Sequence, residues 1–185
     1  MRKVVAAINM TLDGYCDHTS AIADEEIHQH YTDLLLDGGV LLYGRITYKL
    51  MEDFWPTLII NPSGNKDMND FAAAIDQIPK IVFSHSGNMQ VQWETARLAT
   101  RSPKEEVLEL KQSGGKDILI GSRSLIIDLL KDQLIDEFQL TIQPTIMGSG
   151  LPLFNAITEK ISLKLLKTKT FNLSGSVTFY YAPVK

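Results

Sequence analysis

Apolar runs and amphipathic stretches alternate along most of the chain. Short apolar runs bounded by polar or turn residues predict strands at residues 4–9, 40–43, 80–84, 118–120 and 137–144. Apolar positions at helical spacing predict helices at residues 24–36, 45–51, 68–75 and 102–113, and another that follows Ser122 and ends near Leu130. A short strand is expected at residues 90–93, and period-two alternation predicts an antiparallel hairpin from residues 161–170 and 175–181.

Capping signals support the helices. Ser102 is followed by proline and, three residues later, by Glu105, which is the pattern of a capping box with proline at the first helical position. Asp24 opens the first predicted helix with two glutamates after it, and the glycines at 38–39 end it. These signals indicate that the helical segments are separate, well-bounded elements.

Strand–helix–strand units repeat and are followed by a terminal hairpin. This order predicts an α/β fold with a mixed, mostly parallel sheet between helices, that is, a three-layer sandwich with a C-terminal antiparallel hairpin. No linker, internal repeat or low-complexity segment interrupts the sequence. We therefore expect residues 1–185 to form a single domain.

Composition narrows the class of protein. The chain has 44% hydrophobic and 22% charged residues and a net charge of −4, so a general nucleic-acid binder is not expected. Cys16 is the sole cysteine, which excludes an intramolecular disulfide and a multi-cysteine zinc cluster and fits a cytoplasmic location. No apolar run approaches membrane-spanning length. His28 and His30, two residues apart on a helix, face different ways, and no metal site is predicted.

Small and polar residues follow three of the predicted strands. They are Gly44 to Thr47, Ser84, and the pair Gly121 and Ser122. Open α/β sheets bind ligands at the carboxyl ends of their strands, and a helix N-terminus with small residues accommodates phosphate. Each residue also has a purely structural explanation: Arg45 as a surface ion pair, Thr47 as a helix cap and Ser84 as a strand terminator. Taken together, the three sets predict a nucleotide-cofactor site.

The same residues, in the same order, resemble the dihydrofolate reductase superfamily. The similar segments are residues 6–8, 13–14, 42–48, 81–84, 118–122, 136–138 and 148–154. Thr11-Leu12-Asp13-Gly14 resembles the Ser-x-Asp-Gly motif found in the reductase domain of bifunctional riboflavin-biosynthesis proteins. Within the superfamily, the chain therefore looks closest to stand-alone relatives of that domain.

The resemblance implies NADPH as the cofactor. Its pyrophosphate and 2′-phosphate would lie on Gly44, Arg45 and Thr47, with Ser84 at the adenosine end. The residues implied around the diphosphate and the nicotinamide are Gly121, Ser122 and Leu125, together with Ala7 and Gly14.

One position departs from the family pattern. The family usually has two glycines where this chain has Gly121 and Ser122. The serine side chain could crowd the diphosphate or could add a hydrogen bond to it, and both readings are open.

Three residues are candidates for the chemistry of hydride transfer. Asp13 is expected near the transfer site, and Glu26 and His28 are expected to contact the substrate or to donate a proton. Folate reductases have an acidic residue on the first helix; a gapless count gives His28 there, with Glu26 nearby. The structural alternatives are a turn residue for Asp13 and a first-turn carboxylate favoured by the helix dipole for Glu26.

The resemblance implies an NADPH-dependent reductase that acts on a pterin-like or ribosylaminopyrimidine substrate, as in riboflavin biosynthesis. Two alternatives remain: a nucleotide-binding module without reductase turnover, and dihydrofolate reduction, which needs Glu26 in the pocket. The expected partners are a small-molecule substrate and a second copy of the chain in a homodimer, with no nucleic acid or membrane.

Overall fold

The computed structural model describes residues 1–16, 23–85 and 89–184. Its strands are β1 (Val4–Thr11), β2 (Gly38–Gly44), β3 (Lys80–Phe83), β4 (Ala96–Leu98), β5 (Asp117–Ile120), β6 (Glu137–Gln143), β7 (Leu163–Thr170) and β8 (Val177–Pro183). Its helices are α1 (Glu25–Asp37), α2 (Arg45–Ile60), α3 (Lys66–Gln77), α4 (Pro103–Gln112) and α5 (Arg123–Lys131).

All of these strands belong to one sheet in the order β4-β3-β2-β5-β1-β6-β8-β7. The neighbouring pairs from β4 to β6 are parallel, whereas β6 with β8 and β8 with β7 are antiparallel. The predicted mixed, mostly parallel sheet with a C-terminal hairpin is confirmed.

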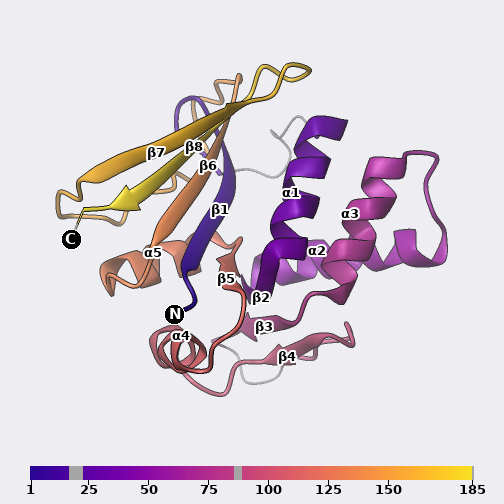
Figure 1. Ribbon diagram of the computed structural model, residues 1–185, viewed down its shortest axis with the longest axis horizontal. Helices are drawn as coiled ribbons and strands as arrows, with labels where there is room; N and C mark the ends of the chain where they lie inside the picture. Colours follow the sequence, from indigo (N-terminus) through magenta and orange to yellow (C-terminus); the bar gives the residue numbers. More distant parts are fainter. Residues whose placement is uncertain (17–22, 86–88, 185) are drawn as a thin grey trace.

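Helices cover both faces of the sheet (Figure 1), so the molecule has three layers. On one face, Leu35 of α1, Tyr48 of α2 and Ile75 of α3 pack in one apolar cluster against β2 and β5. On the other face, Val107 of α4 and Leu129 of α5 pack in a second cluster against the same strands. Strands buried on both faces explain why the predicted runs are continuously apolar.

The capping residues act as the sequence predicts. Ser102 and Glu105 form the reciprocal capping box at the start of α4, with Pro103 in the first turn. The Asp24 side chain accepts a hydrogen bond from the N–H of Ile27 at 2.8 Å and caps α1.

Two predicted elements differ from the structure. The helix expected at residues 45–51 continues to Ile60 with Pro56 inside it. The strand expected at residues 90–93 does not form; the edge strand is β4, which pairs with β3 from Ala96 to Leu98. Trp93 is held instead by its side chain, which is buried and donates from Nε1 to Asp76 Oδ1 at 2.5 Å.

Within the described ranges, no helix combines the length and apolar character needed to cross a membrane.

Candidate functional site

The sheet separates between β5 and β1 at the carboxyl ends of these strands. β1 pairs with β5 only from Val4 to Ala6, where Ala6 lies opposite Ile120, the last residue of β5. On its other side β1 continues to pair with β6 as far as Thr11. From Ala7 onward, β1 has no strand neighbour on the β5 side among the described residues. Ligands of open α/β sheets bind at such places.

Two helices begin beside this opening. α2 starts after Gly44 at the end of β2, and α5 starts after Ser122 at the end of β5, the strand next to β2. Neither helix has a side-chain cap. Their first N–H groups therefore remain available to an anion, which the helix dipoles also favour.

A hydrogen bond joins the two helix starts. The N–H of Gly44 donates to Ser122 Oγ at 2.9 Å, and the Ser122 side chain is buried. A Cβ at position 44 would lie 3.2 Å from Ser124 Oγ, which is a tight contact. A side chain at position 44 would therefore need the Ser124 hydroxyl to move by a few tenths of an ångström, and glycine avoids this shift.

The structure gives Gly121 and Ser122 roles within the protein. A Cβ on Gly121 would lie 3.2 Å from Cε1 of Tyr43, so this glycine makes room for the tyrosine ring. The Ser122 hydroxyl is engaged with the backbone of Gly44. Leu125 is buried in the core beneath α5.

The other predicted phosphate residues surround the helix starts. Arg45 is exposed in the first turn of α2 and makes no hydrogen bond or ion pair with the described residues, which argues against the surface ion pair. Thr47 lies in the same turn and is half-buried; it does not cap the helix, because Gly44 occupies the cap position. Ser84 follows β3, whose last residue, Phe83, pairs with Gly44. The structure therefore brings these residues to one edge of the sheet.

Asp13 holds two loops together. Its carboxylate accepts hydrogen bonds from Thr11 Oγ at 2.6 Å, from the N–H of Gly148 at 2.7 Å and from the N–H of Met147 at 3.2 Å. The Thr11 bond is the main cause of a pKa below the ordinary value of Asp13, and the backbone bonds add to it. Gly14 has a φ of +89°, which completes the tight turn. These contacts correspond to the turn role that the sequence left open for Asp13.

Glu26 is bound to the C-terminal hairpin. Its Oε2 accepts a hydrogen bond from the N–H of Leu173 at 2.9 Å, in the turn between β7 and β8. This carboxylate ties α1 to the hairpin. Dihydrofolate reduction requires Glu26 to point into the pocket, and this contact counts against that alternative.

His28 lies among aromatic side chains. Its ring centroid is 6.2 Å from that of Trp55 and 6.1 Å from that of Phe71, between α1, α2 and α3. Its Nδ1 is buried without a hydrogen-bond partner, and burial lowers its pKa. The imidazole is therefore neutral near pH 7, and no described contact joins it to Asp13 or Glu26.

A polar network under α1 was not predicted. The Tyr31 hydroxyl lies 3.1 Å from Asn9 Oδ1 and 3.1 Å from Thr141 Oγ, and Gln143 Nε2 donates to Asn9 Oδ1 at 3.2 Å. The sequence does carry a signal for it. Asn9 on β1 and the alternate residues Thr141 and Gln143 on β6 place polar side chains on one face of strands whose other face is apolar.

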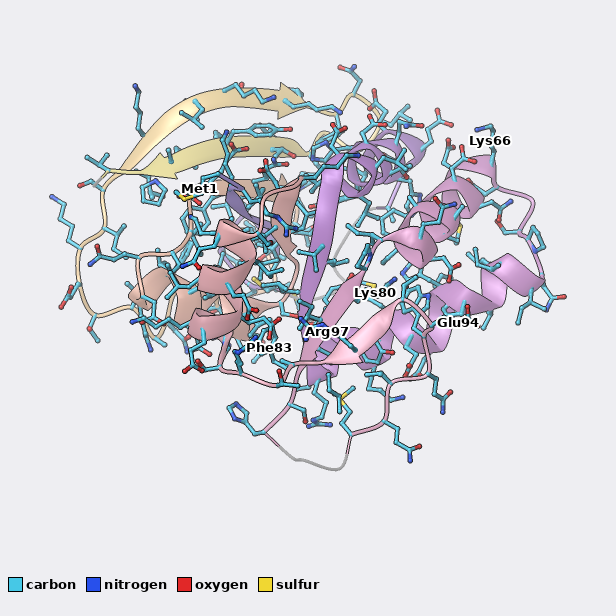
Figure 2. All side chains as sticks on the ribbon, turned by 60° about the horizontal axis from the view of Figure 1, so that its bottom comes forward. Met1, Lys66, Lys80, Phe83, Glu94 and Arg97 are labelled. Carbon is cyan, nitrogen blue, oxygen red and sulfur yellow. The ribbon has the colours of Figure 1, made fainter. Side chains whose placement is uncertain are left out.

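A cavity of about 360 Å³ lies at the opposite end of the sheet and contains none of the predicted cofactor residues. Figure 2 shows Lys80, at the amino end of β3, beside the segment that carries Glu94 and Arg97. Lys80 Nζ donates to the carbonyl of Ile78 at 2.8 Å and to Thr95 Oγ at 2.7 Å. These bonds make Lys80 a structural residue. The described part of the chain holds no cluster of metal-ligating side chains.

The model of one family, the RibD C-terminal domain, matches residues 2–175. The chain belongs to this family. The protein YyaP of Bacillus subtilis (strain 168), an uncharacterized protein by its name, is 32% identical over 184 residues, which cover 97% of this chain and 94% of YyaP.

Solved structures agree on the fold. A pyrimidine reductase-like protein from Corynebacterium diphtheriae has a TM-score of 0.67 and 15% identity, over 100% of this chain and 92% of that protein. The dihydrofolate reductase of Enterococcus faecalis, solved with NADP(H), has a TM-score of 0.66 and 13% identity, over 99% and 97%. The predicted dihydrofolate reductase-like fold and the relationship to riboflavin-biosynthesis reductases are confirmed.

Proposed function

We propose that the protein is an NADPH-dependent reductase that transfers hydride to a ribosylaminopyrimidine or pterin-like substrate, similar to the reductase step of riboflavin biosynthesis. The observation that carries this proposal is the pair of uncapped helix starts, joined by Gly44 and Ser122, beside the opening between β5 and β1. When bound, the cofactor supplies the hydride from C4 of its nicotinamide.

The residues at the starts of α2 and α5 fit the phosphate groups of a dinucleotide. The free N–H groups at the starts of α2 and α5 suit the diphosphate, and glycine at position 44 lets it approach the backbone closely. Arg45, which has no protein partner among the described residues, would pair with the 2′-phosphate, with Thr47 beside it and Ser84 at the adenosine end.

The nicotinamide end would lie where β1 extends past β5. Ala7 is the first residue of β1 beyond that pairing, and its small side chain leaves room for a planar ring. The Asp13 contacts hold the loop that contains Gly14 against Gly148, and Gly14 would flank the ring. The protein would orient the ring and exclude water, which is its usual contribution with such a cofactor.

A fluorescence titration with NADPH and with NADH tests the cofactor. Arg45→Ala should weaken NADPH binding by about tenfold or more and leave NADH binding nearly unchanged, because only NADPH carries the 2′-phosphate. Arg101→Ala, another exposed arginine, is the matched control and should change neither. Absence of NADPH binding in the unaltered protein would refute the proposal.

One observation favours the alternative of nucleotide binding without turnover. The carboxylates of Asp13 and Glu26 are engaged in loop contacts, and His28 lies among aromatic rings. Consumption of NADPH, followed by its absorbance, distinguishes the two functions. We expect consumption with the ribosylaminopyrimidine and none with dihydrofolate; binding without any consumption would support the alternative.

We also propose that the protein forms a homodimer, as the resemblance implies. Its single cysteine favours a cytoplasmic location. β7, at the edge of the sheet, is exposed along its whole length. Light scattering coupled to size-exclusion chromatography measures the mass of the assembly.

A further inference from the structure

The cavity of about 360 Å³ lies at the amino ends of β2, β3 and β4, and we call it the amino-end cavity. Val40 and Ile81 of the sheet and Leu110 of α4 line it, and all three are part of the apolar packing on the α4 face. The cavity therefore lies between α4 and the sheet and has an apolar wall. Glu94 and Arg97, which also line it, lie on the edge segment at this end of the sheet (Figure 2).

Arg2 contributes a buried cation to the amino-end cavity. The residue is only 8% exposed, and its Nε donates to the carbonyl of Lys116 at 2.5 Å. Its Nη1 and Nη2 have no hydrogen-bond or ion-pair partner among the described residues, yet neither is one of the buried atoms without a partner. Both nitrogens therefore border open space. Because Arg2 lines the cavity, their N–H groups are open to it.

A bulge in β2 makes room for this guanidinium. The pairing of β2 with β5 shifts register between Gly38 and Val40, so Gly39 is the extra residue of a β-bulge. A Cβ at position 39 would lie 2.9 Å from Arg2 Nη2 and 2.8 Å from the carbonyl oxygen of Lys116. A backbone oxygen cannot yield at low cost, so this position needs glycine. The bulge thus admits the guanidinium beside Lys116.

The protein does not neutralise the charge of Arg2. Asp117 is the acidic residue whose charge acts on it, but the two form no ion pair, and Asp117 Oδ1 accepts from the N–H of Lys3 at 2.8 Å. Burial outweighs the effect of Asp117 and lowers the pKa of Arg2. Buried charges in proteins are normally paired, so the cavity favours an anion beside Arg2.

The other charged residues of the cavity are already engaged or exposed. Arg97 forms an ion pair with Glu106 of α4, and their charges offset each other. The ammonium of Lys80 is turned toward the opposite face of the sheet, over an aromatic ring of the cluster there. Glu94 is exposed, so solvent and salt screen its charge. An anion in the cavity would therefore interact mainly with Arg2.

We propose that the amino-end cavity binds a small aliphatic carboxylate. Its two oxygens accept from Nη1 and Nη2 of Arg2, because a guanidinium presents its N–H groups in a planar fork that matches a carboxylate. Its hydrocarbon part packs on Val40, Ile81 and Leu110. A phosphate would lose water at this apolar wall without gaining partners for its remaining oxygens. The site is separate from the proposed cofactor site and does not depend on the reductase function.

Butyrate is a probe for this site, and butyramide is its neutral isostere. Each is titrated into the protein, and NMR follows the backbone amide signals of Gly39, Ile81 and Ala96, which line the cavity. We expect saturable shifts with butyrate and binding of butyramide that is weaker by about tenfold or more. Inorganic phosphate, titrated in the same way, should also bind more weakly than butyrate.

Variants test the role of Arg2 itself. Arg2→Met removes the cation, keeps an unbranched stem and should abolish the shifts caused by butyrate. Arg2→Lys keeps the charge without the fork and should weaken butyrate binding by about fivefold. Arg101→Ala, at an exposed arginine paired with Glu109, is the matched control and should leave butyrate binding unchanged.

Four results would overturn the inference: no saturable shifts with butyrate, equal affinity for butyrate and butyramide, tighter binding of phosphate than of butyrate, or unchanged butyrate binding in Arg2→Met. If Arg2→Met does not fold, the comparison of butyrate with butyramide still decides, because it needs no variant. NADPH titration of the same samples tests the reductase proposal separately. Butyrate should leave NADPH binding unchanged, because none of the predicted cofactor residues lines the cavity.

Discussion

The Ser122 hydroxyl accepts a hydrogen bond from the N–H of Gly44, and this bond connects the residues that immediately precede α2 and α5. The residue that departs from the family's two glycines is therefore part of the site's framework. Its hydroxyl is bound to the protein backbone, and its side chain is buried rather than directed into the space above the helix starts.

Ser122→Ala should destabilise the fold and weaken NADPH binding. It leaves the N–H of Gly44 without its acceptor, which costs about 1–3 kcal/mol in the free energy of unfolding. Denaturant unfolding and the NADPH titration measure both effects. Ser113→Ala removes an exposed hydroxyl at the end of α4 and should shift the unfolding free energy by about 0.5 kcal/mol or less.

Ser122→Gly restores the family's glycine pair and should also weaken cofactor binding. If it strengthened NADPH binding instead, the serine would be crowding the diphosphate, and the framework role would be wrong.

Glu26→Gln should leave NADPH binding and turnover unchanged. The carboxylate of Glu26 accepts from Leu173, in the hairpin turn, and an amide oxygen can accept the same bond. Steady-state kinetics with the preferred substrate measure the effect. A large loss of turnover would place Glu26 in the reaction and revive the folate-reductase alternative.

The fold was predictable because its signals are local. The apolar runs of the parallel strands and the Ser102–Glu105 capping box are read from neighbouring residues, and each is found in the structure. The two errors come from tertiary contacts. Helix α2 continues past Pro56, next to which Trp55 packs on Phe71 of α3 with ring centroids 4.4 Å apart, and Trp93 is positioned by Asp76 and Lys80 rather than by a strand.

The candidate site likewise combines residues that a local sequence pattern predicts with contacts that depend on the tertiary structure. The phosphate residues follow strands directly, so a sequence pattern finds them. The polar network under α1 depends on contacts such as that between Asn9 and Gln143, which are 134 residues apart in the chain. Residue type and position near a motif predict Asp13, Glu26 and His28, whereas the loop, hairpin and aromatic contacts of these residues involve distant parts of the chain.

His30 should make the protein less stable in acid. Burial, with Lys169 and Lys167 nearby and Asp33 opposing them, lowers the pKa of His30 to about 4, and its Nε2 is buried without a partner. The unfolded chain binds a proton near pH 6.5, so stability is lost as the pH falls from there toward 4. Between pH 7 and 4.5 this loss amounts to about 2–3 kcal/mol.

Replacement of the imidazole checks this assignment. His30→Phe should lose less stability over the same pH range, because the ring contacts with Phe171 and Tyr180 persist without a titrating group. Denaturant unfolding at the two pH values gives the difference. Equal losses in both proteins would show that His30 does not cause the acid sensitivity.

Lys80 should make the stability of the protein rise with pH in the alkaline range, as His30 does in the acidic range. Its ammonium lies 4.0 Å from the ring centroid of Trp93 and is buried; burial lowers the pKa of Lys80 to about 8, although Asp76 raises it. The unfolded chain keeps this proton until about pH 10.5. Stability therefore rises with pH between 8 and 10.5, by about 2 kcal/mol from pH 7 to 9.5.

Lys80→Met removes the titrating group while it keeps an unbranched apolar stem in the same place. Relative to this variant, the unaltered protein should gain stability between pH 7 and 9.5, as measured by denaturant unfolding at each pH. Lys66→Met, at an exposed lysine of α3, serves as the control and should follow the pH dependence of the unaltered protein. If the stability of Lys80→Met depends on pH as that of the unaltered protein does, the prediction is wrong. The bonds to Ile78 and Thr95 would then offset the cost of burial and keep the ammonium of Lys80 charged between pH 7 and 9.5.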